Sequence, residues 1–477
     1  MAVQYESVIG LEVHCQLETA SKLFSACPLE IGAAPNTRTD AWSWGLPGTL
    51  PVPNKAAIES AIALAVAIGC TVHRRSRFAR KHYVYPDLPK GYQITQGDQP
   101  YATGGALEIP GDAPHRVRVQ RIHLEEDAGK NVHAASTSGV DYNRAGAPLL
   151  EIVSEPDLRS ADQAAAYMRE LRTIVRALGI SHANMEEGTL RCDANVSLRP
   201  VGADTLGVRC EIKNVNSFRF LARAIEAEIL RQTDLLARGE PVLRCTLGYD
   251  HDRDRLFVMR HKEDAADYRW LPDPDLPPLV IDDAWVDAVR ETLPLLPAAR
   301  RAHWRGLGVA VADASLLAAE RDLADYFDAL LDAVGPARAR RASSWLVTEV
   351  LGRLHALPIA SCPVGPKMLG ELVVLVDDDI VSGRAAKEVL DRCWAGEGSP
   401  LAIVDARGLR QTSDTAAIDA IVAAVLAEHP RQVAMLRAGK ANLRGFFVGQ
   451  IIRTSGGQAN PRLVGERLDA AIGEEPS

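Results

Sequence analysis

Three segments in which apolar and polar residues alternate strictly constrain the fold of this chain more than any other feature. They span residues 8–18, 190–199 and 208–213. Successive side chains of a β-strand point to opposite faces of a sheet, so each segment is predicted to be a strand with one apolar and one polar face. The pattern therefore predicts an antiparallel sheet that packs against helices through its apolar face.

The polar faces of these strands carry residue types that are unusual in a solvated sheet. Asp, Asn and Glu are poor strand formers, and here they stand in mid-strand beside a histidine. Carboxylates suit divalent cations, and interleaved basic groups suit phosphates. A hydrogen-bonded sheet with one face in water also explains the alternation, and the pattern leaves both interpretations open. The residues concerned are Glu12, His14, Arg191, Asp193, Asn195, Glu211 and Lys213.

Two other segments add carboxylates in predicted loops or strand ends. Residues 123–130 read His-Leu-Glu-Glu-Asp-Ala-Gly-Lys and include Glu125, and residues 148–153 include Glu151. Three consecutive acids before Ala-Gly-Lys predict a turn that holds charge at a site. Such runs are usually just solvated, so the segment alone does not decide between the two interpretations.

Residues 213–218, Lys-Asn-Val-Asn-Ser-Phe, lead into a predicted helix that ends near Gly239. Asn216 or Ser217 is the expected N-cap, and the free amides at the helix start could receive a phosphate or a carboxylate. No GxxxxGK[ST], GxGxxG or GxSxG motif occurs in the chain. Any use of ATP is therefore expected outside the P-loop and Rossmann designs.

The length of 477 residues is too great for one compact core, and a proline-dense stretch at 272–278 marks the end of the mixed region. We expect an α+β domain over 1–288, a helical domain over 289–365 and a helical tail domain over 366–477. The net charge of −8 argues against coating of nucleic acid by bulk electrostatics, so any RNA contact must be local. The eight cysteines form no CxxC pair, and no run approaches the roughly 18 apolar residues of a membrane helix. A cytoplasmic protein with no membrane partner is expected.

Several ordered motifs resemble the signatures of the GatB family, and the resemblance covers nearly the whole chain. Members of this family are the subunits of tRNA-dependent aspartyl/glutamyl amidotransferases that bind tRNA and act as the kinase. The motifs lie at residues 9–14, 123–130, 141–157, 185–197, 214–218, 267–272, 382–387 and 447–450. The resemblance implies a cradle-shaped N-terminal domain similar in fold to glutamine synthetase, followed by helical parts that help to grip tRNA. It also implies two protein partners, a glutaminase subunit and a further small subunit, and misacylated tRNA(Gln) or tRNA(Asn) as substrate.

In this family the cradle binds ATP and magnesium and phosphorylates the side-chain carboxylate of Glu-tRNA or Asp-tRNA, and ammonia from the glutaminase then displaces the phosphate. The resemblance, together with the polar strand faces, leads us to expect a magnesium ion on Glu12, His14, Glu125 and Glu151. A second cation is expected on Asp193 and Glu211. The residues expected to bind the nucleotide are Arg191, Asn195, Lys213, Asn214, Asn216 and Ser217.

One departure from the family concerns zinc. Many members carry two cysteine pairs around the segment that corresponds to residues 22–48, and these form a tetrahedral zinc site. Here only one of the four positions is a cysteine, and one thiolate cannot make a structural zinc site, so no zinc is predicted. The four positions are Ser25, Cys27, Asp40 and Ser43, and Trp42 and Trp44 are expected to supply apolar packing instead.

Two rival functions stay open at the level of sequence. A free-standing carboxylate-amine ligase could use the same polar face on a small acid, without tRNA or partner proteins. A non-catalytic tRNA-binding scaffold would need the acidic face only for structure. Magnesium-dependent ATP cleavage that requires misacylated tRNA separates the three functions.

Overall fold

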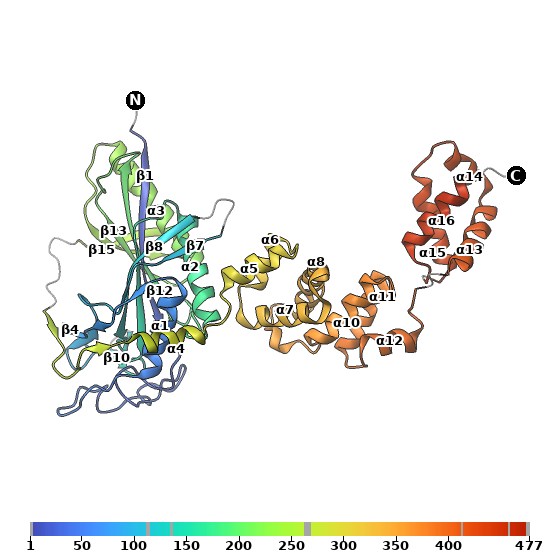
Figure 1. Cartoon of the computed structure of the whole chain (residues 1–477). Helices are drawn as coiled ribbons and strands as arrows, with labels where there is room; N and C mark the ends of the chain where they lie inside the picture. The colour runs from blue at the N-terminus through green and yellow to red at the C-terminus, as the bar shows by residue number, and fades with distance from the viewer. Residues whose placement is uncertain are drawn as a thin grey trace. The chain divides into compact units, whose positions relative to one another are not determined.

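The computed structural model describes residues 3–110, 115–133, 137–261, 269–411, 414–456 and 458–473. It contains two compact units, Met1–Pro297 and Ala298–Ser477 (Figure 1). Within the described residues, all strands belong to the first unit, together with helices α1 to α4. The second unit is helical, so the α+β class predicted from the sequence is confirmed.

A single large sheet forms the frame of the first unit. Its strands follow the order β15-β14-β13-β12-β1-β11-β8-β6-β2, and β7 also pairs with β8. The pairing is antiparallel as predicted, except that β13 and β14 are parallel. Helix α3 connects these two strands and returns the chain to the same end of the sheet, so both strands run in one direction. The strands are β1 Tyr5–Gln16, β2 Thr71–Val72, β6 Ala102–Thr103, β7 Ala106–Ile109, β8 His115–Glu126, β11 Pro148–Ser154, β12 Leu190–Pro200, β13 Cys210–Val215, β14 Cys245–Asp250 and β15 Arg255–His261.

The register of the central strands brings polar residues from distant parts of the sequence together. Glu12 in β1 pairs with Asp193 in β12, and His14 pairs with Glu151 in β11. Glu151 pairs in turn with His123 in β8. Cross-strand partners have neighbouring side chains on one face, so this register alone builds a polar cluster in the middle of the sheet.

The opposite face of the sheet is apolar and covered by helices. Ile9, Leu11, Val13 and Cys15 of β1 are at most 1% exposed. Helix α3 (Phe218–Ala237) contacts β12 and β13, α2 (Ala161–Ala177) packs on α3 and β7, and α1 (Lys55–Ala67) contacts β8. The alternation predicted for residues 8–18 is therefore confirmed, and burial of this face holds the polar cluster in register.

Local signals explain where α3 begins and ends. The Ser217 hydroxyl accepts a hydrogen bond from the backbone N–H of Phe220, which confirms one of the two predicted N-caps. The helix ends at Ala237, close to the predicted Gly239. The preceding strand begins at Cys210, two residues later than predicted, and Val208 is 47% exposed. The alternation at Val208 therefore does not reflect a buried strand position.

Smaller elements complete the first unit. A separate three-stranded sheet of order β16-β4-β5 contacts β8 of the main sheet through β5, and its strand β16 carries residues 270–272 of the motif at 267–272. Residues 267 and 268 of that motif lie outside the described residues. The remaining elements are β3 Arg75–Ser76, β4 Ala79–His82, β5 Tyr92–Thr95, β9 Lys130–His133, β10 Ser138–Asp141, β16 Trp270–Pro272, β17 Leu279–Val280 and α4 Asp283–Glu291.

The second unit contains two apolar clusters. One cluster includes residues from Trp304 to Val404, on both sides of position 365, and the other includes residues from Ile418 to Leu468. The division at 288 and 365 stays a prediction. None of the described helices is long and apolar enough to cross a membrane. The helices are α5 Pro297–Gly306, α6 Val311–Leu317, α7 Arg321–Val334, α8 Ala339–Trp345, α9 Leu351–Leu354, α10 Pro366–Asp377, α11 Gly383–Trp394, α12 Pro400–Arg407, α13 Thr415–Glu428, α14 Pro430–Arg437, α15 Leu443–Thr454 and α16 Pro461–Gly473.

Candidate active site

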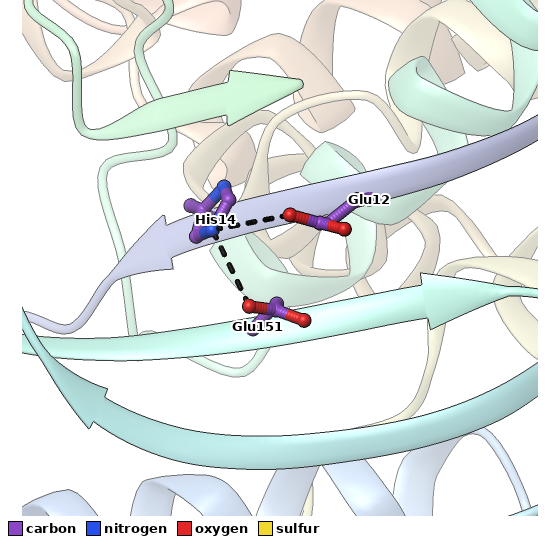
Figure 2. A group of neighbouring side chains, drawn as sticks. All are labelled: Glu12, His14 and Glu151. Carbon is purple, nitrogen blue, oxygen red and sulfur yellow. Dashed lines mark ion pairs between the residues drawn. The ribbon is translucent and has the colours of Figure 1, made fainter. Parts of the chain in front are cut away.

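Four of the predicted site residues meet around the imidazole of His14. Its Nε2 lies 3.5 Å from Glu151 Oε2, 3.6 Å from Glu125 Oε1 and 3.9 Å from Glu12 Oε1. Figure 2 shows Glu12 and His14 on one strand and Glu151 on the neighbouring strand, with their polar ends facing each other. The structure therefore places Glu12, His14, Glu125 and Glu151 side by side, as the sequence predicted.

A fifth residue of this cluster, His123, was not singled out from the sequence. Its Nε2 lies 3.3 Å from Glu151 Oε2 and 3.7 Å from Glu125 Oε2. Of the segment 123–130, predicted to hold a turn, residues 123–126 are the end of strand β8, and residues 127–129 link β8 to β9. His123 and Glu125 are two residues apart and share a face of that strand, so the alternation rule could have found the histidine.

The cluster shifts the pKa values of its own members. Burial opposes protonation of His14 and His123, but hydrogen bonds and the negative charges of Glu125 and Glu151 outweigh it and raise the pKa of each imidazole to about 9. Burial also opposes ionisation of Glu151, yet the two imidazolium groups hold its pKa well below the usual range. Burial and the charge of Glu151 raise the pKa of Glu12. Without a cation, the two protonated histidines offset part of the negative charge of the three carboxylates.

The donor atoms of this cluster fit divalent cations. Glu12, His14 and Glu151 form one group in which all ligand atoms lie within 4.8 Å of one another, and His123, Glu125 and Glu151 form another. Carboxylate oxygens are the ligands that magnesium prefers, and neutral imidazoles coordinate divalent metals through nitrogen. The residues present therefore fit the predicted cation, provided that the histidines lose their protons.

The second predicted cation pair, Asp193 and Glu211, is bridged by Lys213 in the structure. Lys213 Nζ lies 2.5 Å from Asp193 Oδ2 and 3.1 Å from Glu211 Oε1. Burial opposes the charge of Lys213, but the two carboxylates outweigh it and raise its pKa. A cation bound by Asp193 and Glu211 would compete with this ammonium group.

Only some of the predicted nucleotide-binding residues lie at a common cavity. Arg191, Lys213 and Asn216 line a cavity of about 830 Å³ that also reaches His14 and Asp193. Asn195 and Ser217 are not among the lining residues. Ser217 instead caps α3, and Asn195 lies within β12 opposite Gly10. Asn214 belongs to β13, and its side chain lies outside the described residues.

Another cavity, of about 610 Å³, borders the same cluster. Glu12, His123, Glu125 and Glu151 contribute to its lining. Its remaining wall includes three basic side chains and an indole ring, contributed by Arg77, Lys81, Arg121 and Trp270. The carboxylate–histidine cluster thus borders two cavities. His14 lines the larger cavity, and Glu12, His123, Glu125 and Glu151 line the smaller one.

The four positions that correspond to the family's zinc site surround a buried lysine. The fully buried Lys22 donates from Nζ to Ser43 Oγ at 3.0 Å and to the backbone carbonyl of Tyr142 at 3.2 Å. Asp40 Oδ1 accepts hydrogen bonds of 2.8 Å from both the backbone N–H and the hydroxyl of Ser43. Within the described part of the chain, Cys27 belongs to no group of three or more metal-ligating side chains. This donor set does not fit a structural zinc ion.

The two tryptophans of this segment differ in their packing. Trp42 is 6% exposed and meets Phe24 edge to face, with 6.4 Å between ring centroids. Trp44 contacts Tyr142 at 4.8 Å but is 41% exposed. Trp42 therefore provides the apolar packing expected of it, and Trp44 does so only in part.

Comparisons with known proteins identify the family. Residues 7–287 match the family model of the GatB/GatE catalytic domain, and residues 325–472 match that of the GatB domain. The aspartyl/glutamyl-tRNA(Asn/Gln) amidotransferase B subunit of Halorhodospira halophila is 50% identical over 473 residues, which cover 98% of both chains. The protein of the same name from Geobacter sulfurreducens is 50% identical over 475 residues, 98% of this chain and 99% of its own.

The catalytic-domain match covers the sheet and the carboxylate–histidine cluster, and so places the first unit in the GatB/GatE class of catalytic domains. Together with the full-length relatives, it shows that the chain belongs to the GatB family of aspartyl/glutamyl-tRNA(Asn/Gln) amidotransferase subunits. The family predicted from the motifs is confirmed.

Proposed function

We propose that this chain is the component of a glutamine-dependent tRNA amidotransferase that activates the carboxylate of misacylated Glu-tRNA(Gln) or Asp-tRNA(Asn) with ATP. The observation that carries the proposal is the convergence of Glu12, His14, Glu125 and Glu151 at the border of two cavities. Family membership supports the reaction class, a ligase that forms a carbon–nitrogen bond.

The chemistry explains why such a cluster is needed. A carboxylate is a poor electrophile for ammonia, so it must first become an acyl phosphate. Phosphoryl transfer places negative charge on phosphoryl oxygens, and cations bound at the cluster stabilise that charge. Glu12, His14, Glu125 and Glu151 would hold magnesium for this step, and Asp193 with Glu211 would hold a second cation in competition with Lys213.

We assign ATP to the cavity of about 830 Å³, because Arg191 and Lys213 line it and can face phosphate oxygens. Arg191 now donates to Asp127 Oδ2 at 2.7 Å, so phosphate binding would exchange one anionic partner for another. The cavity of about 610 Å³ is left for the aminoacyl end of the tRNA and the incoming ammonia.

The remaining parts of the proposal concern the assembly. The relatives are named as one subunit of an amidotransferase, which supports an assembly of several different chains. A glutaminase subunit would supply ammonia, and a further small subunit would complete the complex. The helical parts, with the predicted limits 289–365 and 366–477, would help to grip the tRNA. All eight cysteines are free thiols, which supports a cytoplasmic location.

Amidation assays on the reconstituted complex test the proposal. Replacing Glu12 or His14 by Ala should leave the fold intact and abolish ATP-dependent conversion of Glu-tRNA or Asp-tRNA. His182→Ala is a matched control, because His182 pairs with Glu18 at 3.4 Å outside the cluster. Wild-type rates in the Glu12 and His14 variants would refute the assignment. Activity without tRNA would favour a free-standing ligase, and ATP-independent tRNA binding as the sole activity would favour a scaffold.

A further inference from the structure

The carboxylate–histidine cluster contains two overlapping sets of metal-ligating side chains. We propose that His123 is a ligand of a further divalent cation, held by His123, Glu125 and Glu151 next to the cation on Glu12 and His14, with Glu125 and Glu151 shared between the two. This inference rests on the proposed function and names the composition of its cation site. The centre is distinct from the Asp193–Glu211 pair, where Lys213 lies between the carboxylates.

The backbone fixes His123 for this role. Three adjacent strands supply the ligands, since His14 pairs with Glu151 and Glu151 pairs with His123 across the ladder. The Nε2 atoms of both histidines point to one oxygen, Glu151 Oε2, at 3.5 Å and 3.3 Å. Glu125 presents Oε1 to His14 and Oε2 to His123. Each carboxylate is therefore placed between the two imidazoles, as bridging carboxylates are in paired metal sites.

The side chains of His123, Glu125 and Glu151 are buried, which distinguishes them from a solvated cluster on the surface. His123 and Glu125 are each 4% exposed, and Glu151 is 9% exposed. Next to them, Thr95 is 1% exposed and lines the same cavity, yet its Oγ1 has no hydrogen-bond partner among the described residues. A buried polar atom without a partner costs about 1–3 kcal/mol. The unpartnered hydroxyl is therefore available to hydrogen-bond a ligand or a coordinated water in this cavity.

The ligand types select the metal. The group around His123 offers one nitrogen and two carboxylates, and the group around His14 does the same. Magnesium prefers an all-oxygen shell, whereas manganese and later transition metals accept imidazole nitrogen. We therefore expect the centre to bind Mn²⁺ more tightly than Mg²⁺, with one nitrogen on each of two neighbouring cations.

Pulsed electron paramagnetic resonance of the full chain loaded with Mn²⁺ alone tests the inference directly. Nuclear modulation from nitrogen bound to manganese reports each coordinated imidazole, and ¹⁵N-histidine labelling of the unmodified chain identifies its source. The expected result is two Mn²⁺ bound per chain, with nitrogen coupling that persists in His14→Ala and in His123→Ala and disappears in the double variant. A single Mn²⁺ per chain would overturn the inference. Loss of all nitrogen coupling in His14→Ala alone would overturn the inference.

Affinity supplies a second readout. His123→Gln keeps the size of the side chain but removes the imidazole, and it should weaken Mn²⁺ binding about 10- to 100-fold, the range seen when metal-site partners are lost. His182→Ala should leave the affinity unchanged. An affinity within twofold of wild type in His123→Gln would count against the ligand role. Failure of the amidation assay with the nitrogen signals intact would instead refute the proposed function and leave the metal centre standing.

Discussion

Replacing Glu126 by Gln should destabilise the first unit more than any change in the cation ligands that flank it. Glu126 is fully buried, and Lys90 Nζ lies 2.5 Å and 2.6 Å from its two carboxylate oxygens. The backbone N–H of Ile94 donates to Glu126 Oε1 at 2.8 Å. The ammonium group of Lys90 also lies over the ring of Trp42, 4.2 Å from its centroid. Loss of the carboxylate charge leaves a buried ammonium without its counter-ion.

The expected size of the effect follows from that burial. Removing one partner of a buried ion pair costs about 3–5 kcal/mol, because the remaining charge cannot reach water. For a unit of this size each kcal/mol lowers Tm by about 2–3 °C, so Glu126→Gln should lower it by about 6–15 °C. Differential scanning calorimetry of the full chain measures this shift, with the transition of the helical unit as an internal reference.

A double-mutant cycle decides whether the ion pair is the cause. Lys90→Met alone should be about as damaging as Glu126→Gln, and the double variant Lys90→Met/Glu126→Gln should recover most of the loss because no unpaired charge remains. A Tm shift below about 2 °C in Glu126→Gln would refute the reasoning. Equal, additive losses in the cycle would show that the two residues do not act as a pair.

Two further predictions concern protonation and zinc. The pKa values of His14 and His123 are raised to about 9, so their stabilisation of the cation-free chain is complete below the unfolded value of about 6.5 and is lost as the pH rises to about 9. Calorimetry with a chelator present should show the first unit losing on the order of 3 kcal/mol per histidine over that range. Lys22→Met should cost about 1–3 kcal/mol, because Ser43 Oγ and the Tyr142 carbonyl lose their donor. Elemental analysis should find no stoichiometric zinc in either form, and zinc bound to Cys27 would contradict the prediction.

Alternation along the sequence located β1, β12 and β13, but not β8 and β11, among the strands that build the site. In β1 the residues Glu12 and His14 alternate with fully buried Leu11 and Val13, and a one-residue slip would expose the entire apolar face. Glu151 was predicted as a site residue from a motif and not from alternation, because β11 is buried along nearly its whole length and shows no separate polar face. In β1, where polar and apolar faces are separate, the sequence therefore identified the residues of the cluster.

His123 was missed for a physical reason. The alternation of His123, Leu124 and Glu125 continues into Glu126, a charged residue on the apolar side of the strand. Glu126 is tolerated there because Lys90, 36 residues earlier, neutralises it. A single sequence gives no sign of that pairing, so the three acids were interpreted as a turn.

The ammonium of Lys213 between Asp193 and Glu211 was also beyond prediction. The polar faces of β12 and β13 were correctly identified, but the sequence did not predict the register in which the two strands pair. Ala194 pairs with Ile212, and the ladder shifts between Cys192 and Ala194, which brings Lys213 diagonally next to Asp193. Register depends on such irregularities, which alternation does not encode.

The two cavities that share the carboxylate–histidine cluster have a consequence for the order of events. Glu12 and His14 are two residues apart on one strand and line different cavities, so under the proposed assignment each reactant would occupy a cavity of its own. A nucleotide could stay seated while successive acceptor ends are tried and rejected on the other side. Discrimination between correct and incorrect aminoacyl groups would then cost no ATP, since the donor need not leave when the wrong acceptor does.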